Sequence, residues 1–387
     1  MAVDAIFNAD NWAPVPFHFW SAVFFGIGCI VGSFLNVVIH RMPLGESIIS
    51  PPSHCPHCNY SIPWWLNIPL VTWLWLRGKC ANCRAPISIR YFLVELLTGL
   101  AFLGCWLRFG DPVHPLYSLP LAFICAVFLA GLIAATFIDF EHLIIPDEIT
   151  LGGIGVGLLA SFFIPALHGQ ESITEAMKQS FLGAAFGGGL VYAILRMGKL
   201  LFGRQRIKLA PGTKIIFSET AVVLPDHEIP YEEVFYRRSD TIILHAETVE
   251  LTDRCYRDVT LRLSPKSLRI DEDKFDPEAV PWLEAVAGEI QLPREAMGLG
   301  DVKFMAAIGA FLGWASVVFS LMASSIIGSV VGVTLIIARR REWSSRLPYG
   351  PYIALAAVIW LFLPAEIQAA WKANLKFLAE LFSGNAR

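Results

Sequence analysis

Two aspartates stand out because each lies at the edge of an otherwise apolar run. Asp139 ends the run "AGLIAATFID", and Asp301 opens the run in "GLGDVKFMAAIGAFLGW". An ionisable side chain at a membrane span is costly and marks a candidate functional site. Two such carboxylates close together split their titration, so one stays ionised while the other keeps its proton. Such a pair can deprotonate a water molecule and protonate a carbonyl oxygen, as an aspartic protease does during peptide hydrolysis.

Each aspartate taken alone also has a simpler interpretation. Asp301 could be an ordinary helix N-cap at the membrane interface, and Asp139 a polar end of a span. Gly298 and Gly300 precede Asp301 and have no side chains, so they permit a turn and let backbone or substrate come close. Asp147, in "IIPDEIT", either caps the following helix or helps to shape the site. A single GxGD pattern does not decide between these interpretations.

Four cysteines form two CxxC pairs, "CPHC" (Cys55 and Cys58) and "CANC" (Cys80 and Cys83), with 21 residues between them. This spacing is typical of a tetrahedral four-cysteine zinc site with a structural role. Two disulfides would be the alternative if the loop faced an oxidising compartment. The other four cysteines are interpreted as small packing residues; they are Cys29, Cys105, Cys125 and Cys255.

The rest of the sequence must place these residues in a membrane. The chain has 387 residues, of which 55% are hydrophobic and only 16% are charged, which predicts an all-α, multi-span membrane protein. The first apolar run lacks a basic start, so we expect it to be retained as a span. Eight apolar runs predict about eight transmembrane helices, near residues 18–39, 91–108, 118–138, 149–166, 180–202, 302–313, 315–338 and 350–366.

Basic residues cluster in three of the connections between these runs. They are Arg41, Arg77, Lys79, Arg84 and Arg90, then Arg196, Lys199, Arg204, Arg206 and Lys208, and finally Arg339, Arg340, Arg341 and Arg346. The positive-inside rule places these connections in the cytoplasm and both termini outside. Asp139 and Asp301 then lie at the same membrane depth on the cytoplasmic face, and the cysteine loop lies in a reducing compartment, which favours zinc. No segment is basic enough to predict nucleic-acid binding.

Residues 209–290 interrupt the apolar pattern. They are rich in charged residues, and "TIILHAETVEL" and "DVTLRLSPKSLRI" show partial strand-like alternation. We interpret them as a small β-rich cytoplasmic domain with a regulatory, docking or purely structural role. The predicted organisation is an N-terminal span (1–39), a zinc-binding loop (40–90), a first bundle segment (91–208), this inserted domain (209–290) and a second bundle segment with the GxGD motif (291–387).

Five motifs occur here in the order found in bacterial type IV prepilin peptidases, the GxGD aspartic proteases of the inner membrane. They are "GSFLNVVIHRMP", the paired CxxC loop ending "APISIRYFLVELLTG", "FIDFEHLIIPDEITL", "GLGDVKFMAAIGAFLGW" and "LPYGPYIAL". The chain resembles this family over roughly residues 20–200 and 295–366. The resemblance departs at the insert, because the usual members have a short connection there.

The resemblance implies a specific activity and cellular location. Such enzymes remove the short basic leader of prepilins or pseudopilins at the cytoplasmic face of the inner membrane, with both termini of this chain periplasmic. The bacterial members also N-methylate the new N-terminal residue with S-adenosylmethionine. By position, Asp139 and Asp301 correspond to the two catalytic aspartates, and the four cysteines to a zinc tetrad. No residue here is assigned to binding the methyl donor.

Two further acidic residues receive weaker interpretations. Asp147 occupies a position that is commonly acidic or amide in this family. Glu95, just inside the second span, is either a structural partner of an arginine such as Arg90 or a group that contacts substrate or methyl donor.

Two other functional classes compete with a peptidase. A transporter would place its carboxylates near the bilayer midplane, often within paired repeats, and neither feature is predicted here. A membrane scaffold that works through its insert and zinc loop would tolerate replacement of both aspartates.

Overall fold

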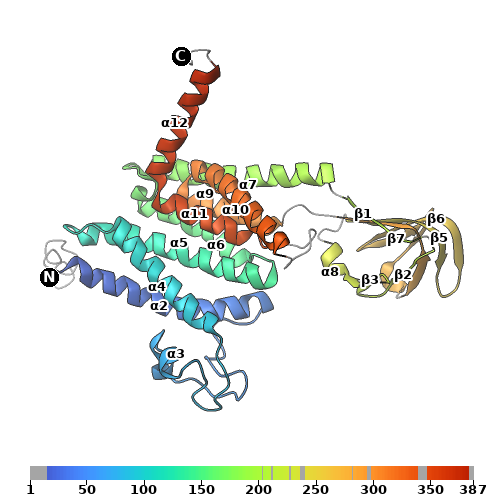
Figure 1. Cartoon of the computed structure of the whole chain (residues 1–387), viewed down its shortest axis with the longest axis horizontal. Coiled ribbons are helices and arrows are strands. Elements are labelled where there is room, and N and C mark those ends of the chain that lie inside the picture. The colour runs from blue at the N-terminus through green and yellow to red at the C-terminus, as the bar shows by residue number, and fades with distance from the viewer. Residues whose placement is uncertain are drawn as a thin grey trace. The chain divides into compact units, whose positions relative to one another are not determined.

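The computed structural model describes residues 15–202, 204–210, 212–225, 228–235, 240–280, 282–293, 298–338 and 347–382. The chain divides into two compact units (Figure 1). The helical unit comprises Met1–Val191 and Leu299–Arg387, and the sheet unit comprises Tyr192–Gly298. The predicted basic cluster of Arg339, Arg340, Arg341 and Arg346 lies outside the described residues.

A helix covers each of the eight apolar runs. These helices are α2 (Phe17–Arg41), α4 (Ile89–Phe109), α5 (Pro115–His142), α6 (Asp147–Phe163), α7 (Ile173–Phe202), α9 (Leu299–Leu312), α10 (Trp314–Ile337) and α11 (Gly350–Phe362). A further helix, α12 (Pro364–Phe382), follows α11. The loop between α2 and α4 contains the short helix α3 (Val71–Trp75) and the 3-10 turns η2 (Met42–Leu44) and η3 (Trp64–Leu66).

The number of membrane spans differs from the sequence-based expectation. Among the described residues, five helices are long and apolar enough to cross a membrane, namely α2, α4, α5, α7 and α10. The pair α11 and α12, bent by 93°, counts as a sixth span if it is taken as one. Helix α6 has 17 residues and α9 has 14, so both are shorter than a span usually requires. The predicted count of eight is therefore not confirmed.

Small residues bring α2 and α4 into close contact. A Cβ atom at Gly28 would lie 2.7 Å from the carbonyl oxygen of Thr98, and one at Gly32 would lie 2.7 Å from the Cα of Glu95. Asn36 Nδ2, one turn further along α2, donates to the carbonyl oxygen of Tyr91 at 3.1 Å. Close backbone approach and interhelical hydrogen bonds are how helices associate in membranes.

Helix α9 is buried from Phe304 to Phe311 and packs closely on α6 and α7. A Cβ atom at Gly157 of α6 would lie 2.9 Å from that of Ala310. On the α7 side, a Cβ atom at Gly183 would lie 2.0 Å from the carbonyl oxygen of Gly309. Ser180 Oγ donates to the carbonyl oxygen of Ala310 at 2.7 Å. Helix α9 is therefore apolar on all sides because other helices surround it, and not because it is long enough to span a membrane.

The described part of the sheet unit forms one sheet of ten strands. They are β1 (Arg204–Lys208), β2 (Lys214–Phe217), β3 (Ala221–Val223), β4 (Glu228–Pro230), β5 (Ile242–Glu250), β6 (Cys255–Ser264), β7 (Ser267–Ile270), β8 (Asp273–Phe275), β9 (Leu283–Val286) and β10 (Glu289–Pro293). The main order is β4-β3-β2-β9-β5-β6-β7-β8, and β10 pairs with both β1 and β5. A short helix, α8 (Tyr231–Val234), and a 3-10 turn, η5 (Pro277–Ala279), complete the unit.

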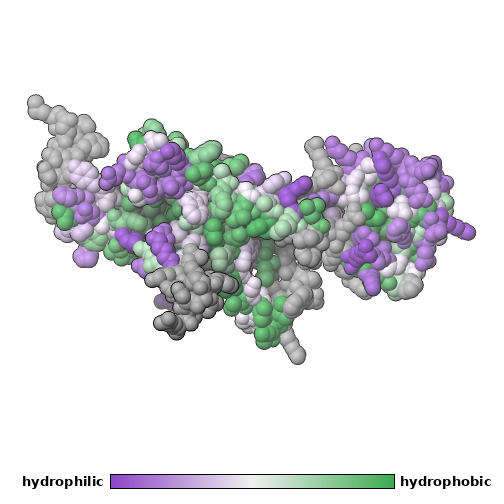
Figure 2. All heavy atoms as spheres, turned by 90° about the horizontal axis from the view of Figure 1, so that it is seen from above, coloured by the Kyte–Doolittle hydropathy of each residue, from purple (hydrophilic) through white to green (hydrophobic). Residues whose placement is uncertain are grey.

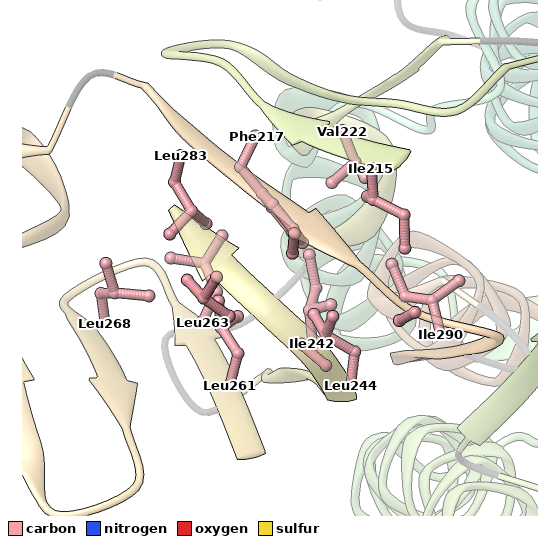
Figure 3. Close-up of a cluster of buried hydrophobic side chains, with 14 of the residues drawn as sticks. Ile215, Phe217, Val222, Ile242, Leu244, Leu261, Leu263, Leu268, Leu283 and Ile290 are labelled. Carbon is pink, nitrogen blue, oxygen red and sulfur yellow. The ribbon is translucent and has the colours of Figure 1, made fainter. Parts of the chain in front are cut away.

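The sheet unit has its own hydrophobic core. Inward-facing side chains such as Ile242, Leu244, Leu261 and Leu283 gather on one side of the strands (Figure 3). Its surface is mainly hydrophilic, whereas the helical unit exposes many hydrophobic residues (Figure 2). The strands extend beyond both ends of the predicted 209–290 segment, because β1 and β10 pair with each other.

The glycine contact between α7 and α9 should be intolerant of any side chain. We expect Gly183→Ala or Gly309→Ala to destabilise the chain by about 1–3 kcal/mol, because the added methyl group overpacks the contact. Thermal unfolding in detergent measures this. Gly189→Ala, also on α7 but with nothing within 4 Å of its Cβ position, is the control. Equal melting temperatures for all three variants would show that the contact is not tight.

Candidate active site and metal centre

Asp139 lies in the last turn of α5 and is only 5% exposed. Its Oδ2 accepts a hydrogen bond from the backbone N–H of Gly350 at 2.8 Å. Gly350 is the first residue of α11. A Cβ atom at Gly350 would lie 2.8 Å from the same carboxylate oxygen, so the contact requires a residue without a side chain. The carboxylate of Asp139 is therefore fixed against the N-terminus of another helix, where backbone N–H groups point at an anion.

Asp301 lies half-buried in the first turn of α9, two residues after the helix begins. The residue before it, Gly300, packs against Ile145, whose Cβ would be 3.3 Å from a Cβ at Gly300. Ile145 also meets Gly350, with its Cδ1 atom 3.1 Å from a Cβ placed there. The segment that carries Asp301 and the segment that holds Asp139 thus converge on one buried isoleucine. Gly298 lies directly before α9 and is exposed.

Asp147 is the first residue of α6 and makes no side-chain cap of that helix. Its Oδ1 instead accepts a hydrogen bond from Lys303 Nζ at 2.6 Å. Lys303 lies two residues after Asp301 on α9, so the ion pair joins the first turns of α6 and α9. The helix cap that was one of the two sequence-based interpretations of Asp147 is therefore not formed.

Glu95 is buried on α4 and has a different partner from the one proposed from the sequence. Its Oε2 accepts a hydrogen bond from the backbone N–H of Leu70 at 2.7 Å. Arg90 instead pairs with Glu141 at the end of α5. The interpretation of Glu95 as the partner of Arg90 is therefore wrong. Glu95 fixes the cysteine loop to the helical unit, because Leu70 immediately precedes α3 in that loop.

An apolar cavity of about 210 Å³ lies between α2, α5, α6 and α9. Its lining includes Phe128, Ile149, Phe304 and Phe311. Phe304 follows Asp301 by about one helical turn, so the cavity borders the same stretch of α9 that carries the carboxylate.

The four cysteines of the two CxxC pairs lie together, with all four Sγ atoms within 4.8 Å of one another. The Sγ atoms of Cys55 and Cys83 are 3.8 Å apart, and those of Cys58 and Cys80 are 4.0 Å apart. Zn–S bonds of about 2.3 Å at tetrahedral angles place sulfur atoms roughly 3.8 Å from each other. The cluster therefore fits a structural zinc ion.

Both CxxC pairs form the same turn. The N–H of Cys55 donates to the carbonyl oxygen of Tyr60, and the N–H of Cys80 donates to that of Ala85. Within the second turn, the N–H groups of Cys83 and Asn82 lower the pKa of the Cys80 thiol to about 6. Hydrogen bonds of this kind favour the thiolate, which is the form that binds metal.

The remaining cysteines and nearby histidines lie outside this cluster. Cys29, Cys105 and Cys125 are buried within helices, as a packing role requires, but Cys255 is exposed at the start of β6. The packing interpretation is therefore wrong for Cys255. His54 and His57 are exposed beside the first CxxC pair.

Three further residues of the site could not be identified from the sequence alone. Gly350 lies within the quoted motif "LPYGPYIAL", but its contact with Asp139 joins positions 211 residues apart. Lys303 and Ile145 each lie two residues from a candidate aspartate, but no sequence pattern predicts which residues they contact.

Comparison with known proteins gives two family matches. Residues 27–109 match the bacterial peptidase A24 N-terminal domain, and residues 126–223 and 282–333 match the type IV leader peptidase family. Together these regions cover more than half of the chain. No solved structure matches the chain significantly.

Curated relatives agree with these matches. A protein of Aeromonas hydrophila named prepilin leader peptidase/N-methyltransferase is 29% identical over 373 residues, which cover 89% of this chain and 92% of that protein. A protein of Myxococcus xanthus with the same name is 42% identical over 196 residues, which cover 50% of this chain and 53% of that protein. A third, from Stutzerimonas stutzeri, is 25% identical over 89% of this chain and 91% of its own length.

The cysteine cluster predicts a metal content that can be measured. We expect the purified chain to carry about one zinc ion per molecule and Cys80→Ser to lose it, because three thiolates do not close a structural site. Elemental analysis measures the metal, and thiol titration before and after chelation measures ligand protection. Cys255→Ser, which removes an exposed cysteine outside the cluster, is the control. Full zinc retention by Cys80→Ser would exclude the four-cysteine site.

Proposed function

We propose that this chain, which belongs to the type IV leader peptidase family, is a membrane-embedded aspartic endopeptidase that removes the leader of prepilins or pseudopilins. Its relatives are named for prepilin leader removal and N-methylation. The observation that carries the proposed mechanism is the convergence of two carboxylate-bearing helix ends, those of Asp139 and Asp301, around Ile145. A peptidase that consumes water needs such a pair where water can reach it.

In the proposed mechanism the two aspartates share one proton and titrate as a coupled pair. The ionised member removes a proton from water while the neutral member donates to the oxygen of the scissile carbonyl. Oδ2 of Asp139 accepts a hydrogen bond from the N–H of Gly350, which fixes the orientation of that carboxylate. We therefore assign Oδ1 of Asp139 to the water or the substrate. Fixed orientation of this kind contributes to rate by holding reacting groups in line.

The surroundings of the pair support a substrate that is partly apolar. The cavity between α2, α5, α6 and α9 begins about one turn beyond Asp301 and is lined mainly by aliphatic and aromatic side chains. We assign it to apolar side chains of the substrate near the scissile bond. Lys303, held by Asp147, places a cation next to the same end of α9.

We also propose N-methylation of the new N-terminal residue, with S-adenosylmethionine as the methyl donor. The names of the curated relatives support this second activity. The zinc-binding loop is assigned a structural role, and no residue is assigned to contact the donor. The proposed setting is the inner membrane with the aspartates at the cytoplasmic face and both termini periplasmic, which the basic residues of the first cytoplasmic loop support.

Replacement of either aspartate should abolish peptidase activity. We expect Asp139→Asn and Asp301→Asn each to slow leader removal on the order of 100- to 10,000-fold, the usual contribution of general acid–base catalysis. Mass spectrometry of a prepilin incubated with enzyme and S-adenosylmethionine measures both leader loss and the mass of one added methyl group. Glu175→Gln, which removes an exposed carboxylate on α7, is the control. Wild-type cleavage by either folded aspartate variant would exclude the aspartic mechanism.

The fixed orientation of Asp139 gives a separate prediction. Gly350→Ala should lower kcat on the order of 100-fold, because the new methyl group displaces the carboxylate that the glycine holds. The matched control is Gly152→Ala on α6, where nothing lies within 4 Å of the Cβ position. Kinetics of leader removal by the two variants, with unfolding temperatures in parallel, make the comparison. A fully active Gly350→Ala would show that the hydrogen bond does not position Asp139.

A further inference from the structure

One face of the sheet unit carries four cations within a series of six neighbouring strand positions. The register places Arg206 opposite Gln291, Gln291 opposite Ile243, and Ile243 opposite Arg262. It continues with Arg262 opposite Arg269 and Arg269 opposite Lys274. Paired residues of adjacent strands point to the same side of a sheet. We call the four basic residues of this series, Arg206, Arg262, Arg269 and Lys274, the cation row.

The cation row points away from the hydrophobic core. Leu261, Leu263 and Leu268, which flank Arg262 and Arg269 in sequence, face the core in Figure 3. Because side chains alternate along a strand, the two arginines lie on the opposite face, where both are exposed. Lys274, the pair of Arg269 across the next strand, is exposed as well.

The arrangement of charges in this row is unfavourable in isolation. Arg262, Arg269 and Lys274 occupy consecutive cross-strand positions, and like charges directly opposite each other destabilise a sheet. Within the described part of the chain, no ion pair joins any of these three cations to a carboxylate; only Arg206, at the other end of the row, approaches one, with its Nε 3.7 Å from Glu289 Oε1. An external anion would relieve this repulsion.

The segment that contains most of the cation row is acidic as a whole. Residues 209–290 contain 17 aspartates and glutamates but only nine lysines and arginines. A surface with this composition would rarely place three cations side by side by chance. An anionic surface would repel most of the sheet unit and attract this one face, so any docking would have a defined orientation.

The short connection between α7 and β1 limits how far the start of the sheet can lie from the membrane. Strand β1, which carries Arg206, begins at Arg204, two residues after the last residue of α7. Helix α7 is one of the five candidate spans. At about 3.4 Å per residue, this connection keeps the start of the sheet close to the end of a membrane helix. The headgroups of the bilayer that α7 crosses are therefore close to the start of the sheet.

From these observations we propose that the cation row docks on anionic phospholipid headgroups of the bilayer that holds α7. The six positions cross five strand intervals of about 4.8 Å each, or roughly 24 Å, with Arg206 at one end and the three adjacent cations at the other. Charges spread over this length can contact several headgroups of a planar array. Basic side chains near an anionic bilayer each add to binding. Docking would hold the sheet unit in one orientation at the membrane surface.

The experiment measures the exposure of Lys274 in the full chain. The protein is reconstituted in nanodiscs of phosphatidylcholine alone or of phosphatidylcholine mixed with phosphatidylglycerol. Each is treated briefly with a water-soluble amine-acylating reagent, and mass spectrometry gives the rate at Lys274 relative to Lys214, an exposed lysine on β2. We expect slower acylation of Lys274 in the anionic discs only, and a return to the neutral-disc rate at high salt.

Paired variants test whether the row itself is responsible. Arg262→Gln with Arg269→Gln should weaken docking about 25-fold, at roughly fivefold per cation, and should abolish the protection of Lys274. The control, Arg254→Gln with Arg257→Gln, removes two arginines of the same unit outside the row and should retain protection.

Two outcomes would overturn the proposal. The first is an equal acylation rate of Lys274 in neutral and anionic discs. The second is protection in native membrane vesicles but not in pure-lipid anionic discs, which would assign the cation row to an acidic protein instead. Both outcomes leave the leader-peptidase assignment untouched, because they are read without any substrate.

Discussion

The helical unit depends on holding a carboxylate in an apolar interior. Burial of an unpaired charge is so costly that a buried carboxylate persists only with hydrogen-bond donors around it. For Asp139 the observed donor is the backbone N–H of Gly350, at the start of a helix 211 residues further along the chain. This single contact ties α5 to α11. The segment after α5 then places Ile145 against both Gly350 and Gly300, which brings α9 and Asp301 to the same place.

Such contacts are possible because glycines remove side chains where helices meet. Gly183 faces Gly309 between α7 and α9, and Gly157 of α6 meets Ala310 on another side of α9. A helix of 14 residues cannot rely on lipid contact to fix its depth. Close packing against α6 and α7 supplies that restraint, so the position of Asp301 follows from neighbouring helices rather than from a full-length span.

The sequence predicted the helices and the cysteine cluster, but not the long-range partners of the buried polar side chains. Apolar runs and the CxxC spacing are local patterns, and the structure contains the corresponding helices and Sγ cluster. The number of spans depends on helix length and on the 93° bend after α11, which hydropathy alone does not report. The contacts of Asp139, Glu95 and Arg90 join distant segments, and no spacing rule specifies them.

The sheet unit is organised differently, because the chain enters and leaves it on neighbouring strands. Its first and last strands, β1 and β10, pair with each other, so the chain leaves the sheet beside the point where it entered. A domain with adjacent ends can be inserted between two helices without separating them. The regions that match the family end and resume within this sheet, at residues 223 and 282, and the intervening strands include Arg262, Arg269 and Lys274. The part of the sheet that lies outside the family match is therefore also the part that carries these three adjacent cations.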